Sequence, residues 1–351
     1  MMNSVVTSLW GRQQRFAQAT WLRQVPPPAW STTHRVLMDE GSWALRDFSK
    51  DEVSRPMVLV VPPEVNASTI VDFSAEQSLV GTILSHGFSR VAALCWGSAD
   101  EDSRERGIDD SVMSILASLE RLSSLTGHKS HHVVGVCQGG WESAIAAALQ
   151  PDRFASLTLV AAPIDFHAGA GLVQGLARSL PMAVFENMVA MGEGVMRGKF
   201  ISSGFDNLLP FERYFLKYLS IWNHLDDAEW MERFYELNDW YRAPKDLPGP
   251  MYLQAVRELF KDNKLIKGRM EVMGRRVELS NIRCPVALVA GSKDHITPPE
   301  QVWAAEAAVG SQKIFRRLIP AGHVGTFMGK QALADHWPAV LAKLREWEDE
   351  A

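Results

Sequence analysis

The sequence predicts an α/β protein with a mostly parallel central sheet and an inserted helical segment. Helix-like stretches alternate with short apolar runs in the first half of the chain, which calls for parallel strands joined by right-handed crossovers. Residues 165–280 break this alternation with a long helix-like stretch that is rich in methionine and aromatic residues. The apolar runs are typical of strands that are buried on both faces, and they cover residues 56–63, 91–96, 157–163 and 285–291.

Length and composition narrow the class of protein. With 351 residues, 46% of them hydrophobic, the chain is long for one core, so we expect one domain with a large insertion or two intimate domains. The 36 Lys and Arg residues against 41 Asp and Glu residues give a net charge of −5, which offers no basic field for nucleic acid. No apolar run reaches about 18 residues, so no transmembrane segment is expected.

The cysteines and the N-terminus indicate a cytoplasmic protein. Cys95, Cys137 and Cys284 are too few and too scattered for a disulfide framework or a metal site. Residues 1–6 lack the basic start and the long apolar core of a secretory signal. A reducing compartment fits this cysteine usage best, and we expect no bound metal.

Four parts follow from this organisation. We expect an N-terminal arm over residues 1–35, a first part of the core over 36–164, a helical cap over 165–280 and a second part of the core over 281–351. The core begins with a β-hairpin over residues 34–48. A cap of this kind excludes water and shapes a substrate pocket.

Aromatic residues in the arm and in the cap allow two interpretations each. Trp10, Phe16 and Trp21 in the arm have loosely helical spacing, as does Trp30, and three prolines end the segment. Such a stripe favours a helix packed on its own domain over an arm that binds a hydrophobic body or a membrane. Most cap aromatics must form the core of the cap, although Trp240 and Tyr241 are candidates to face the site.

A candidate nucleophile stands where a strand changes into a helix. The sequence Gly-Val-Cys-Gln-Gly around Cys137 follows a β-branched run and precedes an Ala-rich helix, which is the order of a nucleophile elbow. The strained backbone of an elbow needs small neighbours, and Gly135 and Gly139 supply them. Cys137 read alone is a small buried hydrophobe, but this spacing favours a nucleophile. The backbone N–H groups of Gln138 and Val65 are the expected oxyanion donors, with Asn66 as the alternative to Val65.

An acid and a base follow two later strands. Asp294 comes just after the run 285–291, and His323 follows the next predicted strand, so both lie where open α/β sheets keep their sites. Each residue alone is ordinary, since Asp is common in turns and most histidines are structural. The order Cys, Asp, His is that of the α/β-hydrolase fold, and it predicts a catalytic triad. His295 is a rival base, although its place beside the acid favours a supporting role.

These motifs together resemble the catalytic subunit of polyhydroxyalkanoate synthases, over roughly residues 35–345. The short N-terminal region is similar to that of the class whose small catalytic subunit works with a second subunit. The segments that carry the resemblance are Gly-Val-Cys-Gln-Gly-Gly at 135–140, Pro-Pro-Glu-Val-Asn at 62–66, Leu-Pro-Gly at 247–249, Lys-Asp-His-Ile at 293–296 and Ala-Gly-His-Val at 321–324.

The resemblance implies an acyltransferase that polymerises 3-hydroxyacyl-CoA through an acyl thioester on Cys137 and releases CoA. His323 would take the proton of Cys137, Asp294 would orient His323, and one of these two would help to deprotonate the incoming hydroxyl. No cofactor is implied, because the CoA thioester is the substrate. The expected partners are the 3-hydroxyacyl-CoA, the polyester chain, a second synthase subunit, a homodimer mate and the surface of a cytoplasmic polymer granule.

Other functions remain open at this stage. An intracellular polyhydroxyalkanoate depolymerase, or another ester or thioester hydrolase, would use the same Cys-His-Asp triad and differ only in the access of water. A granule-bound protein without activity could share the fold, but the intact triad argues against it. A basic cluster fits CoA phosphates less well than a solvated helix face, and it consists of Lys261, Lys264, Lys267, Arg269, Arg275 and Arg276.

Overall fold

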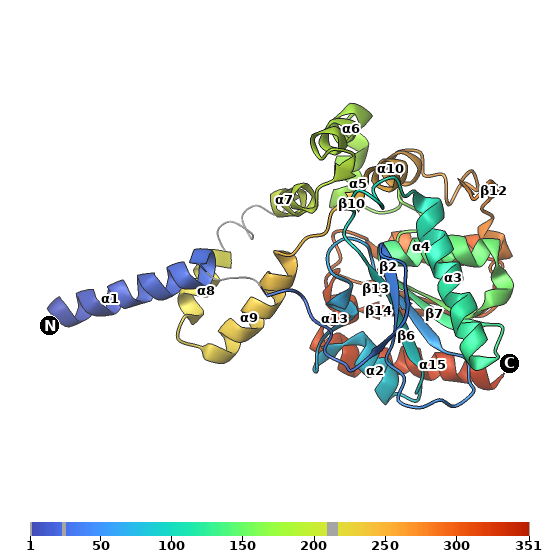
Figure 1. Ribbon diagram of the computed structural model, residues 1–351, viewed down its shortest axis with the longest axis horizontal. Coiled ribbons are helices and arrows are strands. Elements are labelled where there is room, and N and C mark those ends of the chain that lie inside the picture. The colour runs from blue at the N-terminus through green and yellow to red at the C-terminus, as the bar shows by residue number, and fades with distance from the viewer. Residues whose placement is uncertain (1, 23–25, 209–216, 351) are drawn as a thin grey trace. The chain divides into compact units, whose positions relative to one another are not determined.

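An eight-stranded sheet forms the core of the larger of two units in the computed structural model (Figure 1). The larger unit comprises residues 29–197 and 245–351, and the smaller one comprises residues 1–28 and 198–244. The segment expected as one cap, 165–280, is therefore shared between the two units. The structure describes residues 2–22, 26–208 and 217–350.

The sheet has the order β1-β2-β6-β3-β7-β8-β13-β14. β1 and β2 form the predicted N-terminal hairpin and are antiparallel to their neighbours, whereas every neighbouring pair from β6 to β14 is parallel. The expectation of a mostly parallel sheet is therefore confirmed. The strands are β1 (Arg35–Asp39), β2 (Trp43–Asp47), β3 (Val58–Val61), β6 (Val91–Trp96), β7 (His131–Val136), β8 (Phe154–Val160), β13 (Val286–Gly291) and β14 (Ile314–Ile319).

Burial explains why the central strands read as continuous apolar runs. All residues of β3 and β13 are buried, because both faces of the sheet are covered. Figure 1 shows α3 and α4 on one side of the sheet and α13 on the other. The helices of this unit that follow the core strands are α2 (Leu79–Ser85), α3 (Ile108–Thr126), α4 (Gln138–Leu149), α11 (Pro299–Trp303), α12 (Ala305–Ala308), α13 (Gly325–Met328), α14 (Lys330–Asp335) and α15 (Trp337–Asp349).

Helix α3 shows how local signals and packing agree. The sequence places apolar residues of this helix at helical spacing, and four of them, Val112, Ile115, Leu119 and Leu122, are fully buried, whereas the fifth, Leu116, is half-buried. The carboxylate of Asp110 accepts the backbone N–H that precedes the helix. The helix ends at a glycine in the left-handed region, which a residue with a side chain would adopt only with strain.

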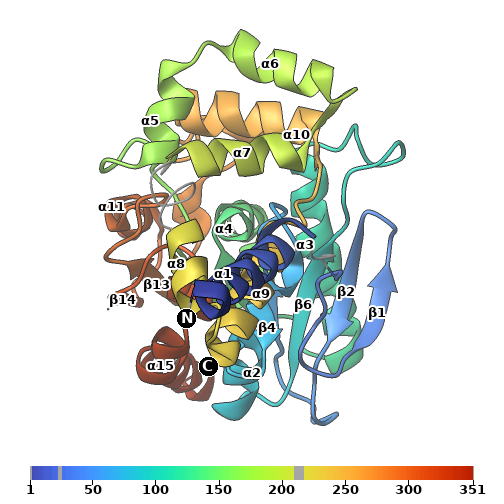
Figure 2. The same ribbon diagram turned by 90° about the vertical axis from the view of Figure 1, so that its left-hand side faces the viewer.

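Further helices of the larger unit lie at the carboxyl ends of the parallel strands. α5 (Leu172–Ser179), α6 (Met182–Met191) and α10 (Gly249–Gln254) lie together above the sheet (Figure 2). The N–H of Leu172 donates to the carbonyl of His295, just after β13, and the N–H of Met251 donates to the carbonyl of Arg106.

The remaining short elements of the larger unit are β4 (Asp72–Ser74), β5 (Gln77–Ser78), β9 (Val195–Met196), β10 (Leu247–Pro248), β11 (Glu271–Val272), β12 (Arg275–Arg276), the π-helix Ala255–Lys261 and the 3₁₀ turns Ser68–Val71, Pro151–Arg153 and Leu279–Asn281.

The smaller unit is helical. It contains α1 (Met2–Ala17), the π-helical turn Gln18–Leu22, α7 (Gly198–Leu208), α8 (Lys217–His224) and α9 (Ala228–Tyr241).

The N-terminal helix is packed in its own unit, as the favoured interpretation has it. Phe16 packs edge-on against Trp222 of α8 at 5.7 Å, and the guanidinium of Arg12 donates to the carbonyl of Trp222 at 2.9 Å. Trp10 stays exposed, and the side chain of Trp21 lies outside the described residues. Trp30 belongs to the larger unit, where it stacks at a tilt with Phe48.

No helix among residues 2–22, 26–208 and 217–350 combines the length and the apolar character that crossing a bilayer requires.

Candidate active site

The turn between β7 and α4 holds Cys137 in a strained conformation. Its φ of 53° and ψ of −115° lie outside the regions that L-residues favour. The glycines around it are needed because the backbone packs closely: a Cβ on Gly139 would lie 2.2 Å from the carbonyl oxygen of Val61, and one on Gly135 would lie 2.6 Å from that of Gly139. A Cβ on Gly140 would lie 2.3 Å from that of Ala162. This is the geometry that the glycine spacing predicts for an elbow.

Asp294 and His323 meet after the carboxyl ends of β13 and β14. Nδ1 of His323 lies 2.7 Å from Oδ2 of Asp294, and only 10% of the His323 side chain is exposed. The other carboxylate oxygen of Asp294 accepts the backbone N–H groups of Ile296 and Thr297, both at 2.9 Å. These three hydrogen bonds fix the carboxylate and leave Nε2 of His323 as the ring nitrogen for Cys137.

His323 is built to carry a proton. Burial alone would lower its pKa, but the negative charges of Cys137 and Asp294, together with hydrogen bonds from the ring to both, raise this pKa to about 10. The site therefore favours the protonated form of the His323 ring. A cation in this position stabilises a neighbouring thiolate, which is the nucleophilic form of cysteine.

The two expected oxyanion donors lie in the two segments that flank the elbow. Gln138 is the first residue of α4, and Val65 follows β3 in a half-buried position. The next residue, Asn66, has a φ of 63°, so the chain turns sharply there. Among the described hydrogen bonds, neither the N–H of Gln138 nor that of Val65 reaches a backbone carbonyl. Their role as oxyanion donors stays a prediction.

The other candidate residues have contacts of their own. The side chain of His295 is exposed, and its carbonyl serves as an anchor for α5. Trp240 and Tyr241 belong to α9 of the smaller unit, where the hydroxyl of Tyr241 donates to Asp206. Several members of the basic cluster have local partners: Lys261, Lys267 and Arg276 donate to nearby carbonyls and Lys264 pairs with Glu258.

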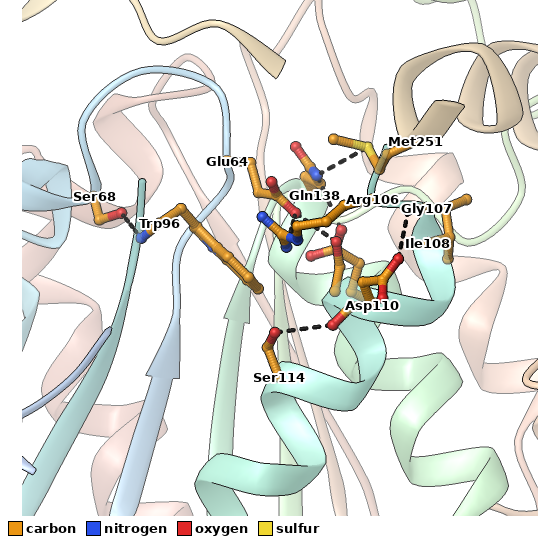
Figure 3. A network of polar contacts seen from close by, with 12 residues as sticks. Glu64, Ser68, Trp96, Arg106, Gly107, Ile108, Asp110, Ser114, Gln138 and Met251 are labelled. Atoms are coloured by element: carbon orange, nitrogen blue, oxygen red, sulfur yellow. Dashed lines mark hydrogen bonds and ion pairs between the residues drawn. The ribbon is translucent and has the colours of Figure 1, made fainter. Parts of the chain in front are cut away.

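A buried polar network that no local sequence motif predicts lies beside the elbow (Figure 3). Glu64, which directly precedes Val65, accepts a hydrogen bond from Ser111 at 2.5 Å and pairs with Arg106 at 3.7 Å. Glu142 on α4 accepts a hydrogen bond from Nε2 of Gln138 at 2.9 Å. Two glutamates inside apolar segments were the available signal, since such residues are almost never fully buried unless they are paired.

Burial governs the electrostatics of this network. It raises the pKa of Glu64, against the opposing charge of Arg106 and the hydrogen bond from Ser111. It raises the pKa of Glu142 further, and the charge of Glu64 adds to this effect. Burial also lowers the pKa of Lys245, whose ammonium donates to the carbonyl of Trp96.

The larger unit has the α/β-hydrolase fold, with cysteine at the turn between β7 and α4. In solved structures, a monoacylglycerol lipase from Paleococcus ferrophilus matches 87% of this chain and 99% of its own, with a TM-score of 0.55 at 16% identity. Mouse alpha/beta hydrolase domain-containing protein 10 matches 90% of this chain and 99% of its own, with a TM-score of 0.52 at 15% identity. These likenesses concern the fold.

The chain belongs to the family described as protein of unknown function (DUF3141), whose model matches residues 23–313. It is also similar to poly(3-hydroxyalkanoate) polymerase subunits PhaC, as the sequence motifs predict. The subunit of Haloferax mediterranei is 26% identical over 88% of this chain, which spans 63% of that relative's length. The subunit of Allochromatium vinosum is 25% identical over 82% of this chain and 80% of its own.

Proposed function

We propose that this protein is an acyltransferase of the poly(3-hydroxyalkanoate) polymerase type, which lengthens a polyester from 3-hydroxyacyl-CoA. The observation that carries the proposal is Cys137, held at a strained elbow and facing the His323–Asp294 pair. A thiolate exchanges acyl groups with a thioester at little net cost in free energy, so cysteine suits a CoA substrate. The PhaC names of the relatives support this substrate class.

The reaction takes place in two transfers. In the first, the Cys137 thiolate attacks the thioester carbonyl, the N–H groups of Gln138 and Val65 stabilise the oxyanion, and CoA leaves with the proton from His323. In the second, His323 accepts the proton of a hydroxyl group of another 3-hydroxyacyl unit. This oxygen attacks the acyl group on Cys137, an ester bond forms, and the thiolate is regenerated. Asp294 keeps the ring oriented in both steps.

The experiment is to incubate the purified chain with 3-hydroxybutyryl-CoA and to follow CoA, polymer and free 3-hydroxybutyrate together. Polymer with stoichiometric CoA supports the proposal. CoA with free acid identifies a thioesterase instead, and the absence of CoA release both alone and with added polymer granules contradicts the assignment to this substrate. Cys137→Ala is the matched control, because it removes the sulfur and keeps the backbone.

We also propose that a second synthase subunit and the surface of a polymer granule act as partners in this reaction. A second synthase subunit and the polymer granule surface would each raise the rate of polymer formation if they complete the enzyme. Each partner is tested separately, by adding to the same assay either the second subunit of a two-subunit synthase or purified granules.

A further inference from the structure

Glu142 is a buried carboxyl group that the proposed mechanism does not use. It lies on α4, one helical turn after Gln138, and its side chain is fully buried. Oε1 accepts the hydrogen bond from Gln138, whereas Oε2 is buried and has no hydrogen-bond partner among the described residues. An ionised carboxylate with an unpaired buried oxygen is far more costly than a neutral acid in the same place.

The nearby positive charges compensate one ionised glutamate but not two, so Glu64 and Glu142 are not both ionised. Apart from one another, the two glutamates are influenced by four charged or titratable groups, Arg106, Asp110, Cys137 and Lys245. Asp110 is engaged by the N–H of Gly107, and Lys245 donates to a carbonyl. Among the residues that the structure describes, Arg106 is the cation that forms an ion pair in this network, and its partner is Glu64. The charge balance therefore assigns ionisation to Glu64 and leaves Glu142 protonated, in line with its raised pKa.

The network touches both segments that carry the expected oxyanion donors. Glu64 is the residue before Val65, and Glu142 holds the side chain of Gln138. Gln138 also contacts the sulfur of Met251 on α10 at 3.7 Å, and the carbonyl of Arg106 accepts the N–H of Met251 at 3.1 Å (Figure 3). One set of contacts thus joins the loop after β3, the start of α4 and α10.

We infer that Glu142 is a neutral carboxylic acid and a positioning residue, which together with the Glu64–Arg106 ion pair fixes the two backbone segments that bind the oxyanion. This inference rests on the proposed function, because acyl transfer is the step in which the oxyanion forms. Neutrality matters because a further buried negative charge would repel both the Cys137 thiolate and the developing oxyanion.

The same substitution at the two glutamates separates their roles. Glu142→Gln keeps an acceptor for Gln138 and stays neutral, so CoA release should remain within about threefold of the wild type, whereas Glu142→Ala should lose about 10–100-fold in kcat. Glu64→Gln removes the counter-ion of Arg106 and should also lose about 10-fold or more. A Glu142→Gln variant as slow as Glu142→Ala, or a fully active Glu64→Gln variant, would overturn the inference.

Infrared spectroscopy tests the protonation state without any substrate. The wild type at pH 8 should show the C=O stretch of a protonated carboxyl group. This band should be absent from Glu142→Gln and present in Glu120→Gln, which removes an exposed glutamate of α3. Absence of the band from the wild type, or its loss in Glu64→Gln alone, contradicts the assignment. If the chain releases no CoA, the proposed function fails, while this band still decides whether Glu142 is neutral.

Discussion

A pair of buried histidines and one histidine of the candidate site lie at opposite ends of β7, and their pKa values shift in opposite directions. His131 and His132 begin β7, where burial lowers the pKa of both to about 4. His323 lies near the other end of β7, with a pKa raised to about 10. Burial disfavours the imidazolium in all three, so the difference comes from the partners of the ring.

The partners at the start of β7 suit neutral rings. The backbone N–H of Met57 donates to Nδ1 of His131, and Nδ1 of His132 lies 2.8 Å from the hydroxyl of Ser156. No carboxylate pairs with either ring in the described structure. At the elbow, two anions face His323 from either side. The comparison indicates that the partners of the ring, and not its burial, set the direction in which the pKa of a histidine shifts here.

The Cys137→Ala substitution should have the largest effect on the difference between His323 and the other two histidines. It removes the nucleophile, so CoA release should fall by about 10⁴-fold or more. It also removes one of the two anions, so the pKa of His323 should fall below 10 and move toward that of the other histidines. Steady-state kinetics and NMR titration of the ring protons measure the two effects. Persistent turnover would show that another residue is the nucleophile.

Asp294→Asn removes the second anion and keeps the shape of the side chain. The ring of His323 loses its orientation, and the rate should fall by about 10³-fold. The pKa of His323 should fall as well, by an amount that NMR titration compares with the Cys137→Ala variant. A wild-type rate would mean that the carboxylate has no part in catalysis.

Low pH should destabilise the folded protein through His131 and His132 at the start of β7. The folded pKa of each ring is about 4 against an ordinary value of 6.5, so the unfolded chain binds more protons between these values. The contribution of these two histidines to the free energy of unfolding is therefore fully present above pH 6.5. It is lost as the pH drops toward 4, by up to about 3 kcal/mol for each histidine.

Urea unfolding at pH 7 and at pH 4.5 measures this loss. His132→Gln removes one titrating ring, so the loss between the two pH values should shrink by about half relative to the wild type. An unchanged loss would place the acid sensitivity in other groups.

His295→Gln is the smallest expected effect and serves as the control for the histidines. Because its ring is exposed, and its carbonyl accepts the one hydrogen bond that it makes among the described residues, the rate of CoA release should change less than about twofold. A large loss would restore His295 as the rival base.

Local patterns in the sequence predict the strands and the elbow well. β3 reads as an apolar run because both of its faces are buried, and the elbow glycines are visible because no side chain fits beside Val61. The pairing of Asp294 with His323 follows from strand ends that meet at one edge of the sheet. These are features in which a short stretch of chain determines its own environment.

The parts that escaped prediction depend on contacts between distant segments. The buried network joins three separate segments through Glu64, Arg106 and Glu142. The sequence around each of these residues does not predict its contact with the other two. The division of residues 165–280 between two units depends on the packing of α8 and α9 with the N-terminal helix. Hydrophobic periodicity shows that such helices are amphipathic, but it does not say which partner covers them.

The short ribbon of β9 and β10 makes the length of the segment between its strands nearly independent of the sheet. Residues 198–244 leave the larger unit next to Met196 and return next to Leu247, and these two residues are paired across the ribbon. An ion pair between Arg197 and Asp246 at 2.8 Å ties the two ends together. Because adjacent ends can be joined by a chain of almost any length at a slowly growing entropic cost, this position is a natural graft point. A segment of another length can therefore replace residues 198–244 while the pairing of Met196 with Leu247 is kept.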